Sequence, residues 1–230
     1  MCGDDSASER GGRQASPQRA DWTLIVMARV PQAGKVKTRL AGELGAAGAA
    51  ELHARLLRQT LLRAQRARGA RLEWWFDGRR EAAGAFLRGA KLDPRRDVGL
   101  FEQRGADLGR RMDDAITDAL QRAGAGARCV LIGSDCPAQT TQDLEQAADA
   151  LLEHELVLQP ATDGGYVLIG MTRPRPALFA SIEWGSSSVL ARTMAIASDA
   201  GLRLRLLRPL PDLDTPADLK EALVRGWLED

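Results

Sequence analysis

The chain is poor in the residues that several common functional sites require. It has two histidines, His53 and His154, three cysteines, and an aromatic content of 4%. So few imidazoles exclude a histidine-rich metal site or a zinc signature. An odd number of cysteines in 230 residues does not indicate a disulfide framework, which favours the cytoplasm as the compartment. A Ser–His–Asp triad would need one of the two histidines, and neither lies in a turn context that favours it.

Long apolar runs and an excess of charge of one sign are also missing. No segment is apolar for long enough to span a bilayer, and the N-terminus has no apolar core of a secretory signal. The formal net charge is +1, and the few aromatic side chains offer few stacking surfaces. We therefore expect neither a membrane span nor a nucleic-acid partner. The net charge does not exclude small phosphorylated ligands.

What the chain does contain is typical of a globular protein. Hydrophobic residues make up 44% and charged residues 27% of the sequence. Residues 1–20 are rich in Ser, Gly, Arg, Asp and Gln and predict a disordered tail. No linker or internal repeat divides the remainder, so residues 21–230 are predicted to form a single domain.

Short apolar runs alternate with segments of helical periodicity along this domain. The alternation predicts an α/β fold with a mostly parallel sheet and helices on both faces. Residues 89–106 carry no clear pattern because Pro94, Gly99 and Gly105 interrupt it. The predicted strands are 23–28, 71–76, 129–132, 155–160, 166–170 and 202–207, and the predicted helices are 46–68, 80–88, 108–120, 140–152, 188–200 and 215–227. Thr140 or Thr141 is the predicted cap of the fourth helix, and Thr215 that of the last.

One apolar run, residues 130–132, ends abruptly in Gly133, Ser134, Asp135 and then Cys136-Pro137. This pattern predicts a buried strand whose carboxyl end presents the carboxylate of Asp135. Ligands of open α/β sheets lie beyond the carboxyl ends of the strands, and a lone carboxylate there suits a hard divalent cation that carries phosphates. The other interpretation, a turn capped by Asp and stopped by Pro, is equally consistent with the pattern.

A basic loop joins the first strand to the first long helix. Gly34, Lys35, Lys37 and Arg39 lie within six residues, although Lys91 and Lys220 are the only other lysines of the chain. Ammonium groups in a glycine-containing loop before a helix suit a phosphate. The spacing is not that of a Walker motif, and a solvated basic loop is the alternative.

Two further carboxylates, Asp212 and Asp214, precede the last predicted helix. If the sheet is parallel, they lie at the same edge as Asp135. Two carboxylates from separate segments, together with diphosphate oxygens and water, would complete a Mg²⁺ or Mn²⁺ shell. Helix capping by Asp212 or Asp214 is the alternative, and the sequence does not decide which of the two would be the second ligand.

Three other segments contain candidate site residues. Asp163-Gly164-Gly165-Tyr166 is typical of a hairpin turn, but its glycines also suit backbone contact with a sugar or phosphate while Asp163 faces the ligand. Asp107 precedes a helix, where capping explains most of the signal. Trp184 beside Gly185 suits a sugar-stacking floor or a plug of the core.

Taken in order, these motifs resemble a known family. The chain is similar to a bacterial GT-A-type glycosyltransferase family once known only as a domain of unknown function, whose members occur with arsenosugar or selenium-associated gene sets. That family is itself similar to nucleotidyltransferases that guanylylate molybdopterin or 2-phospholactate. The motifs, which span about residue 23 to the C-terminus, are Pro31-x-x-Gly34-Lys35-x-Lys37-Thr38-Arg39-Leu40, Gly105-Ala106-Asp107-Leu108-Gly109-x-Arg111-Met112, Gly133-Ser134-Asp135-Cys136-Pro137, Asp163-Gly164-Gly165-Tyr166, Trp184-Gly185-Ser186 and Asp212-x-Asp214-Thr215-Pro216-x-Asp218.

The resemblance implies a Rossmann-like αβα sandwich, the nucleotide-diphospho-sugar transferase (GT-A) fold, with a nucleotide at the carboxyl ends of its first strands. It implies Asp135 and Asp214 as ligands of Mg²⁺ or Mn²⁺ and places Asp163 in the sugar or acceptor pocket. We predict that Asp163 activates an acceptor hydroxyl there. The implied nucleotide and phosphate contacts are Gly34, Lys35, Lys37, Thr38, Arg39 and Asp107, and the implied sugar or acceptor contacts are Gly164, Gly165, Tyr166 and Trp184.

The resemblance favours a cytoplasmic, metal-dependent glycosyltransferase that uses a nucleoside-diphosphate sugar and a small-molecule acceptor. The alternative is a nucleotidyltransferase that joins an NTP to a phosphorylated small molecule with release of pyrophosphate. The Gly-x-Gly-x-Arg start of such enzymes is absent from the chain. Ala138-Gln139 and Ser186 depart from the family pattern, which concerns the acceptor more than the fold. A non-catalytic nucleotide-binding module is a further alternative.

Overall fold

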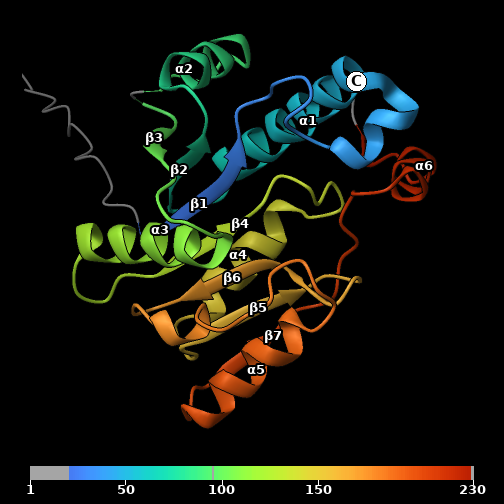
Figure 1. The fold of residues 1–230 in the computed structure, drawn as a ribbon. Helices are drawn as coiled ribbons and strands as arrows, with labels where there is room; N and C mark the ends of the chain where they lie inside the picture. Colours follow the sequence, from blue (N-terminus) through green and yellow to red (C-terminus); the bar gives the residue numbers. More distant parts are fainter. Residues whose placement is uncertain (1–20, 95, 229–230) are drawn as a thin grey trace, which may run out of the picture.

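The structure is a computed structural model that describes residues 21–94 and 96–228. Its centre is a seven-stranded sheet in the order β3-β2-β1-β4-β6-β5-β7 (Figure 1). Strand β6 is antiparallel to its neighbours β4 and β5, and the other pairings are parallel. The predicted mostly parallel sheet is therefore confirmed. The strands are β1 (Trp22–Arg29), β2 (Ala70–Asp77), β3 (Gly99–Glu102), β4 (Cys129–Ile132), β5 (Leu156–Pro160), β6 (Tyr166–Met171) and β7 (Leu204–Leu206).

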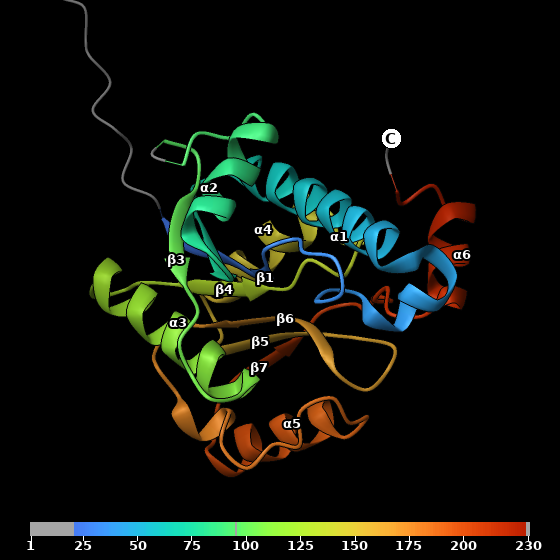
Figure 2. The same ribbon diagram turned by 45° about the horizontal axis from the view of Figure 1, so that its top comes forward.

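Helices cover both faces of the sheet because its central strands are apolar on both sides (Figure 2). In β1, Leu24 and Val26 belong to a core with helices α1, α2 and α4, whereas Ile25 and Met27 belong to a core with α3 and α5. The α-helices are α1 (Ala41–Gln65), α2 (Arg80–Gly89), α3 (Leu108–Ala123), α4 (Thr141–Ala150), α5 (Val189–Asp199) and α6 (Pro216–Val224), and two short 3₁₀ helices are η1 (Thr38–Leu40) and η2 (Pro176–Leu178).

A third, smaller core lies beside the carboxyl edge of the sheet. It joins Leu40 of η1 and Leu56 of α1 to Leu213 and to Leu219 of α6. All four side chains are nearly or fully buried. This core fixes the loop after β1 against the segment before α6, so two segments that are far apart in the sequence lie side by side.

Strand β3 is the element that the sequence did not predict. It has four residues, only two of which are large and apolar, and it pairs with β2 alone at the edge of the sheet. An edge strand that is half exposed lacks the continuous apolar run by which β1 and β4 were found. Helix α1 begins at Ala41, earlier than predicted, and its chain bends at Gly45 (φ 70°, ψ 165°).

The predicted caps of two helices are confirmed. Thr140 and Thr215 each cap a helix in a reciprocal capping box with an aspartate three residues later. Among the described residues, no helix is long and apolar enough to cross a membrane. The predicted disordered tail, residues 1–20, lies outside the described residues.

A buried ion pair joins the sheet to α3. The side chain of Glu73 in β2 is 1% exposed, and Arg122 donates to both of its carboxylate oxygens at 2.7 and 2.8 Å. The indole of Trp75 donates a third hydrogen bond at 3.0 Å. The guanidinium also lies over the ring of Phe101 at 4.4 Å.

Substituting Arg122 with Met should lower the free energy of unfolding by about 3 kcal/mol, because it leaves a buried carboxylate without its cation. Urea denaturation measures this loss. The control is Arg225→Met, which removes an exposed i,i+4 pair with Glu221 and should cost about 1 kcal/mol or less. Equal losses in the two variants would contradict the prediction.

Candidate functional site

An open cavity of about 570 Å³ lies at the carboxyl ends of β1 and β4, where the sequence predicted a ligand. Its walls come from the end of β1, the basic loop, the amino end of α3 and the Asp135 turn. Of the predicted nucleotide, phosphate and metal residues, Lys35, Lys37, Thr38, Arg39, Asp107, Asp135 and Asp214 line it. Gly34 lies in the same loop with a φ of +76°, a conformation that favours glycine.

Lys37 holds two of these carboxylates together. Its Nζ lies 2.8 Å from Oδ1 of Asp135 and 2.9 Å from Oδ1 of Asp214. Its side chain is 5% exposed, whereas those of Asp135 and Asp214 are 45% and 40% exposed. Burial by itself would lower the pKa of Lys37, but the two carboxylates outweigh it and raise the pKa above its ordinary value.

Lys37 has a third contact within the protein. An ammonium has three N–H donors, and besides the two carboxylates it reaches the carbonyl of Leu213. All three donors therefore face protein oxygens in this structure. In the same loop, Lys35 and Arg39 are exposed to the cavity, and Arg39 contacts Asp214 only loosely at 3.6 Å.

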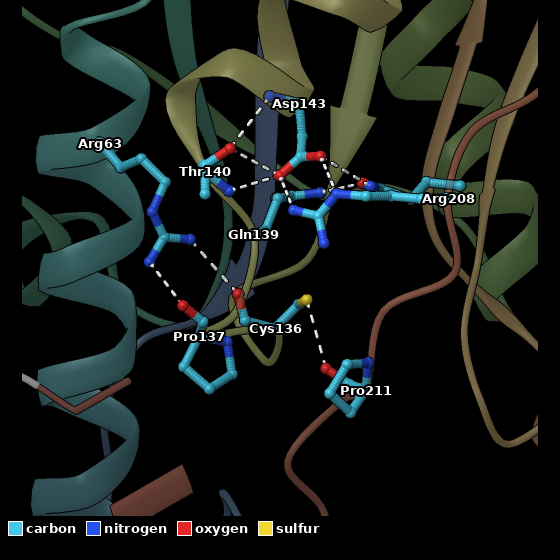
Figure 3. A network of polar contacts seen from close by, with 9 residues as sticks. Arg63, Cys136, Pro137, Gln139, Thr140, Asp143, Arg208 and Pro211 are labelled. Carbon is cyan, nitrogen blue, oxygen red and sulfur yellow. Dashed lines mark hydrogen bonds and ion pairs between the residues drawn. The ribbon is translucent and has the colours of Figure 1, made fainter. Parts of the chain in front are cut away.

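The Asp135 turn is fixed from behind by α1 and by the segment before α6 (Figure 3). Arg63 donates to the carbonyls of Cys136 and Pro137 at 3.3 and 3.2 Å. The thiol of Cys136 donates to the carbonyl of Pro211 at 3.3 Å, and burial raises the pKa of this thiol to about 12. These contacts hold the turn and keep Cys136 protonated.

A backbone hydrogen bond ties the two acidic segments to each other. The N–H of Leu213 donates to the carbonyl of Asp135 at 2.8 Å. Leu213 itself is buried, and its neighbours Asp212 and Asp214 line different cavities. Asp214, and not Asp212, shares the Lys37 ammonium with Asp135.

Asp143 anchors the loop that follows the Asp135 turn (Figure 3). Its carboxylate completes the capping box of α4, in which Thr140 is the N-cap. Arg208 donates to both carboxylate oxygens of Asp143 at 2.9 and 2.7 Å. Gln159 donates at 3.4 Å and accepts from Gln139 at 2.9 Å. Burial alone would raise the pKa of Asp143, but the hydrogen bonds from Thr140 and Arg208 outweigh it and hold the pKa below its usual 3.8.

Sequence reasoning missed four residues of the first cavity. Arg29 and Arg111 approach the same oxygen of Asp77, at 3.4 and 2.9 Å, where β1 and β2 end. Gln103 donates to the carbonyl of Trp75 at 2.8 Å. Arg111 belongs to the third-helix motif, but the other residues carry no sequence signal of their own. The four missed residues are Arg29, His53, Gln103 and Arg111, and the rest of the lining consists of the predicted residues, Ser134 and apolar side chains.

His53 is the fourth of these missed residues. Its Nε2 lies 2.9 Å from the carbonyl of Arg29, and since a carbonyl only accepts, this nitrogen carries the proton. Burial lowers the pKa of His53 below its ordinary value. The neutral imidazole therefore presents Nδ1 as an acceptor near physiological pH. A single histidine within an apolar helix face gave no indication of this position.

A second cavity, of about 320 Å³, adjoins the first. Asp135, Met27 and Leu108 line both. The charged residues among its described lining are Asp135, Asp163 and Asp212, all of which are carboxylates. Burial, and then the negative charge of Asp163, raise the pKa of Asp212 to about 6.

The glycines of the 163–166 turn serve the turn itself. The N–H of Gly165 donates to Oδ1 of Asp163 at 2.8 Å, and that of Gly164 to the carbonyl of Ala161 at 3.4 Å. Gly164 has a φ of +95°, and a Cβ there would come within 2.2 Å of the carbonyl oxygen of Ser187. The predicted donation by these N–H groups to a ligand is therefore not available in this conformation. Asp163, Gly165 and Tyr166 do line the second cavity.

Trp184 and Asp107 take the structural roles that the sequence left open for them. Trp184 packs in a core beside Phe179 and Tyr166, and a Cβ at Gly109 would come within 2.5 Å of its indole nitrogen. It does not line either of the two cavities. Asp107 caps α3 by accepting from the N–H of Arg110 at 2.8 Å, although it also faces the first cavity.

The fold and its similarity to a solved structure define a class of protein. A β3-β2-β1-β4-β6-β5-β7 sheet with an antiparallel β6 and a cavity at the carboxyl ends of its first strands is the nucleotide-diphospho-sugar transferase fold. The chain belongs to the family described as an uncharacterized protein conserved in bacteria (DUF2064), whose pattern matches residues 56–186. No curated protein matches the chain at a significant level.

Solved structures agree with this assignment. A Desulfovibrio desulfuricans G20 protein, provisionally assigned as a nucleotide-diphospho-sugar transferase, has 31% sequence identity and a TM-score of 0.80 over 90% of this chain and 87% of its own. The 4-diphosphocytidyl-2C-methyl-D-erythritol synthase of Anaerococcus prevotii DSM 20548 has 10% identity and a TM-score of 0.57 over 92% and 99%. Rv0371c of Mycobacterium tuberculosis H37Rv, crystallised with manganese, has 20% identity and a TM-score of 0.52 over 88% and 98%. The last two share the fold alone.

Substituting Asp143 with Asn should lower the free energy of unfolding by about 2 kcal/mol at neutral pH, because an amide cannot accept from all of its donors. The folded-state pKa of Asp143 is depressed, so this stabilisation is present above the unfolded pKa and is lost as the pH falls through the folded pKa. Urea denaturation at pH 7 and pH 3 measures the difference in free energy of unfolding between the wild type and Asp143→Asn. This difference should be smaller at pH 3. Asp149→Asn, which alters an exposed side chain of the same helix, is the control. An equal difference in free energy of unfolding at the two pH values would contradict the prediction.

Proposed function

We propose that the protein is a transferase that uses a nucleoside-diphosphate sugar as the donor and a small molecule with a hydroxyl group as the acceptor. The observation that carries this proposal is the pair of cavities that meet at Asp135. One is rich in basic side chains and the other has carboxylates as its charged groups. A donor diphosphate and a hydroxylated acceptor need surroundings of these two kinds.

The first cavity suits the nucleotide. Lys35 and Arg39 are exposed on the loop after β1. Arg29 and Arg111 line the same cavity and both contact Asp77 at the end of β2. Cations that are already in place stabilise the charge that develops on a departing nucleoside diphosphate without further reorganisation. Lys37 contributes its positive charge to this field, although its N–H donors are directed at carboxylates.

The donor set also suits a divalent cation that arrives with phosphates. Asp135 and Asp214 each direct Oδ1 to Lys37, while both side chains stay partly exposed to the cavity. The described residues contain no cluster of three or more metal-binding side chains. Mg²⁺, and Mn²⁺ in a similar way, binds through one or two carboxylates plus substrate phosphates, so these two residues would hold it. When bound, the cation would neutralise charge on the diphosphate.

The second cavity suits the acceptor. Asp163 lines it beside Asp212, whose pKa of about 6 reflects burial and the charge of its neighbour. A carboxylate of such a pair can accept a proton that a hydroxyl releases during transfer. We assign this role to Asp163, with Asp212 beside it, and we assign Gly165 and Tyr166 to the wall of the acceptor pocket.

The alternative is nucleotidyl transfer from an NTP to a phosphorylated molecule. The lining of the second cavity disfavours it, because a phosphate would meet carboxylates and no compensating cation among the described lining residues. The two reactions differ in their products. Glycosyl transfer releases a nucleoside diphosphate from the nucleotide sugar, whereas nucleotidyl transfer releases pyrophosphate from an NTP.

Nucleoside diphosphates and their sugars should raise the melting temperature more with Mn²⁺ than without it. A thermal-shift panel of UDP, GDP, CDP and their glucose conjugates measures this, with GTP and CTP as the comparison. Asp135→Asn and Asp214→Asn should remove most of the Mn²⁺-dependent rise in melting temperature. Asp199→Asn, at an exposed helix end, should keep this rise. Unchanged nucleotide and Mn²⁺ binding in Asp135→Asn, or stabilisation by GTP or CTP alone, would contradict the proposal.

Asp163→Asn should lower kcat for transfer by about 100-fold or more, because a positioned base is lost. The KM for the nucleotide sugar should stay close to that of the wild type, since Asp163 lies outside the first cavity. Release of nucleoside diphosphate with a panel of polyol acceptors is the measurement. A normal kcat would remove Asp163 from the mechanism.

A further inference from the structure

Lys37 has an unusual position for a lysine in a phosphate-binding loop. Its backbone is in the left-handed region, with a φ of 46° and a ψ of 41°. This conformation is costly for a residue other than glycine, on the order of 1 kcal/mol. It turns the side chain inward, where the ammonium reaches Asp135, Asp214 and the carbonyl of Leu213. Lys35, two residues earlier, is exposed and lines the open cavity.

The ammonium occupies the space between the two carboxylates that would hold a divalent cation. Together Lys37, Asp135 and Asp214 carry a formal charge of −1. The two carboxylates alone would carry −2. A divalent cation that approaches the pair by itself is attracted by two negative charges but repelled by a buried positive charge a few ångströms away. The ammonium therefore keeps the carboxylates together and at the same time weakens their attraction for a free cation.

A nucleoside diphosphate changes this balance. Its phosphate oxygens add negative charge in the first cavity and provide the ligands that two carboxylates cannot supply. The cation and the diphosphate should then bind with positive coupling, and such coupling is reciprocal.

We propose that Lys37 is a positioning residue and internal counter-ion of the Asp135–Asp214 pair, which makes binding of a divalent cation depend on a bound nucleoside diphosphate. This inference rests on the proposed function for the identity of the ligand. It differs from that function in assigning Lys37 to the carboxylates and not to the phosphates.

Mn²⁺ titrations of the full chain, followed by the electron paramagnetic resonance of the free ion, test this inference. In the wild type, Mn²⁺ alone should bind weakly, and the tightest-binding nucleoside diphosphate of the panel should increase its affinity by about tenfold or more. In Lys37→Met, the affinity for Mn²⁺ alone should rise about tenfold, because the repelling charge is gone. In this variant the nucleoside diphosphate should increase the affinity for Mn²⁺ by less than it does in the wild type.

Lys37→Gly is the second variant, because glycine adopts the left-handed backbone without strain and so preserves the turn. The matched control is Lys35→Met, which removes the same charge from the same loop. It should weaken nucleotide binding and leave the affinity for Mn²⁺ alone within about twofold of the wild type, since an exposed charge is screened.

Two results would overturn the inference. One is a wild type that binds Mn²⁺ equally well with and without the nucleoside diphosphate. The other is a pair of Lys37 variants that bind Mn²⁺ alone no more tightly than the wild type and lose nucleotide affinity as Lys35→Met does, which would make Lys37 a phosphate ligand. A failure of the proposed function is distinct, because no nucleoside diphosphate would then bind to any of the proteins.

Discussion

The site depends on one buried ammonium group. Lys37 joins the loop after β1, the turn after β4 and the segment before α6 by contacts with Asp135, Asp214 and the carbonyl of Leu213. Without the ammonium between them, the carboxylates of Asp135 and Asp214 would repel each other. The three segments would then lose the contacts that join them. The hydrogen bond from Leu213 to Asp135 and the small apolar core around Leu40 support the same junction.

This junction also separates two kinds of surroundings. The first cavity is lined by exposed basic side chains at the end of the sheet. In the second cavity the charged lining residues are carboxylates. Asp135 lies at the boundary of both. Because Leu213 is buried between them, Asp212 and Asp214 line different cavities. The sequence Asp-Leu-Asp does not by itself reveal this. The transfer chemistry that we propose follows from this difference in charge.

Much of the fold was predictable because its central strands are buried on both faces. The apolar runs of β1 and β4, the Asp-Gly-Gly turn between β5 and β6, and the Thr caps of α4 and α6 are local signals, and the structure agrees with each of them. Strand β3 escaped prediction because an edge strand of four half-exposed residues has no periodicity to recognise.

The site was predictable in location but less so in its contacts. The sequence placed Asp135, Asp214 and the basic loop at one edge, and the structure brings them together. It did not give the direction of Lys37, which depends on a left-handed backbone and on a partner 177 residues away. Nor did it find His53 or Gln103, whose positions in the cavity depend on tertiary contacts with the backbone of β1 and β2.

The most direct test of the central claim is a crystal structure with a nucleoside diphosphate and Mn²⁺. The account predicts the diphosphate in the first cavity against Lys35 and Arg39, with Mn²⁺ bound by Asp135, Asp214 and phosphate oxygens and with the second cavity left open for an acceptor. A diphosphate bound in the second cavity, or Mn²⁺ bound away from both carboxylates, would contradict it.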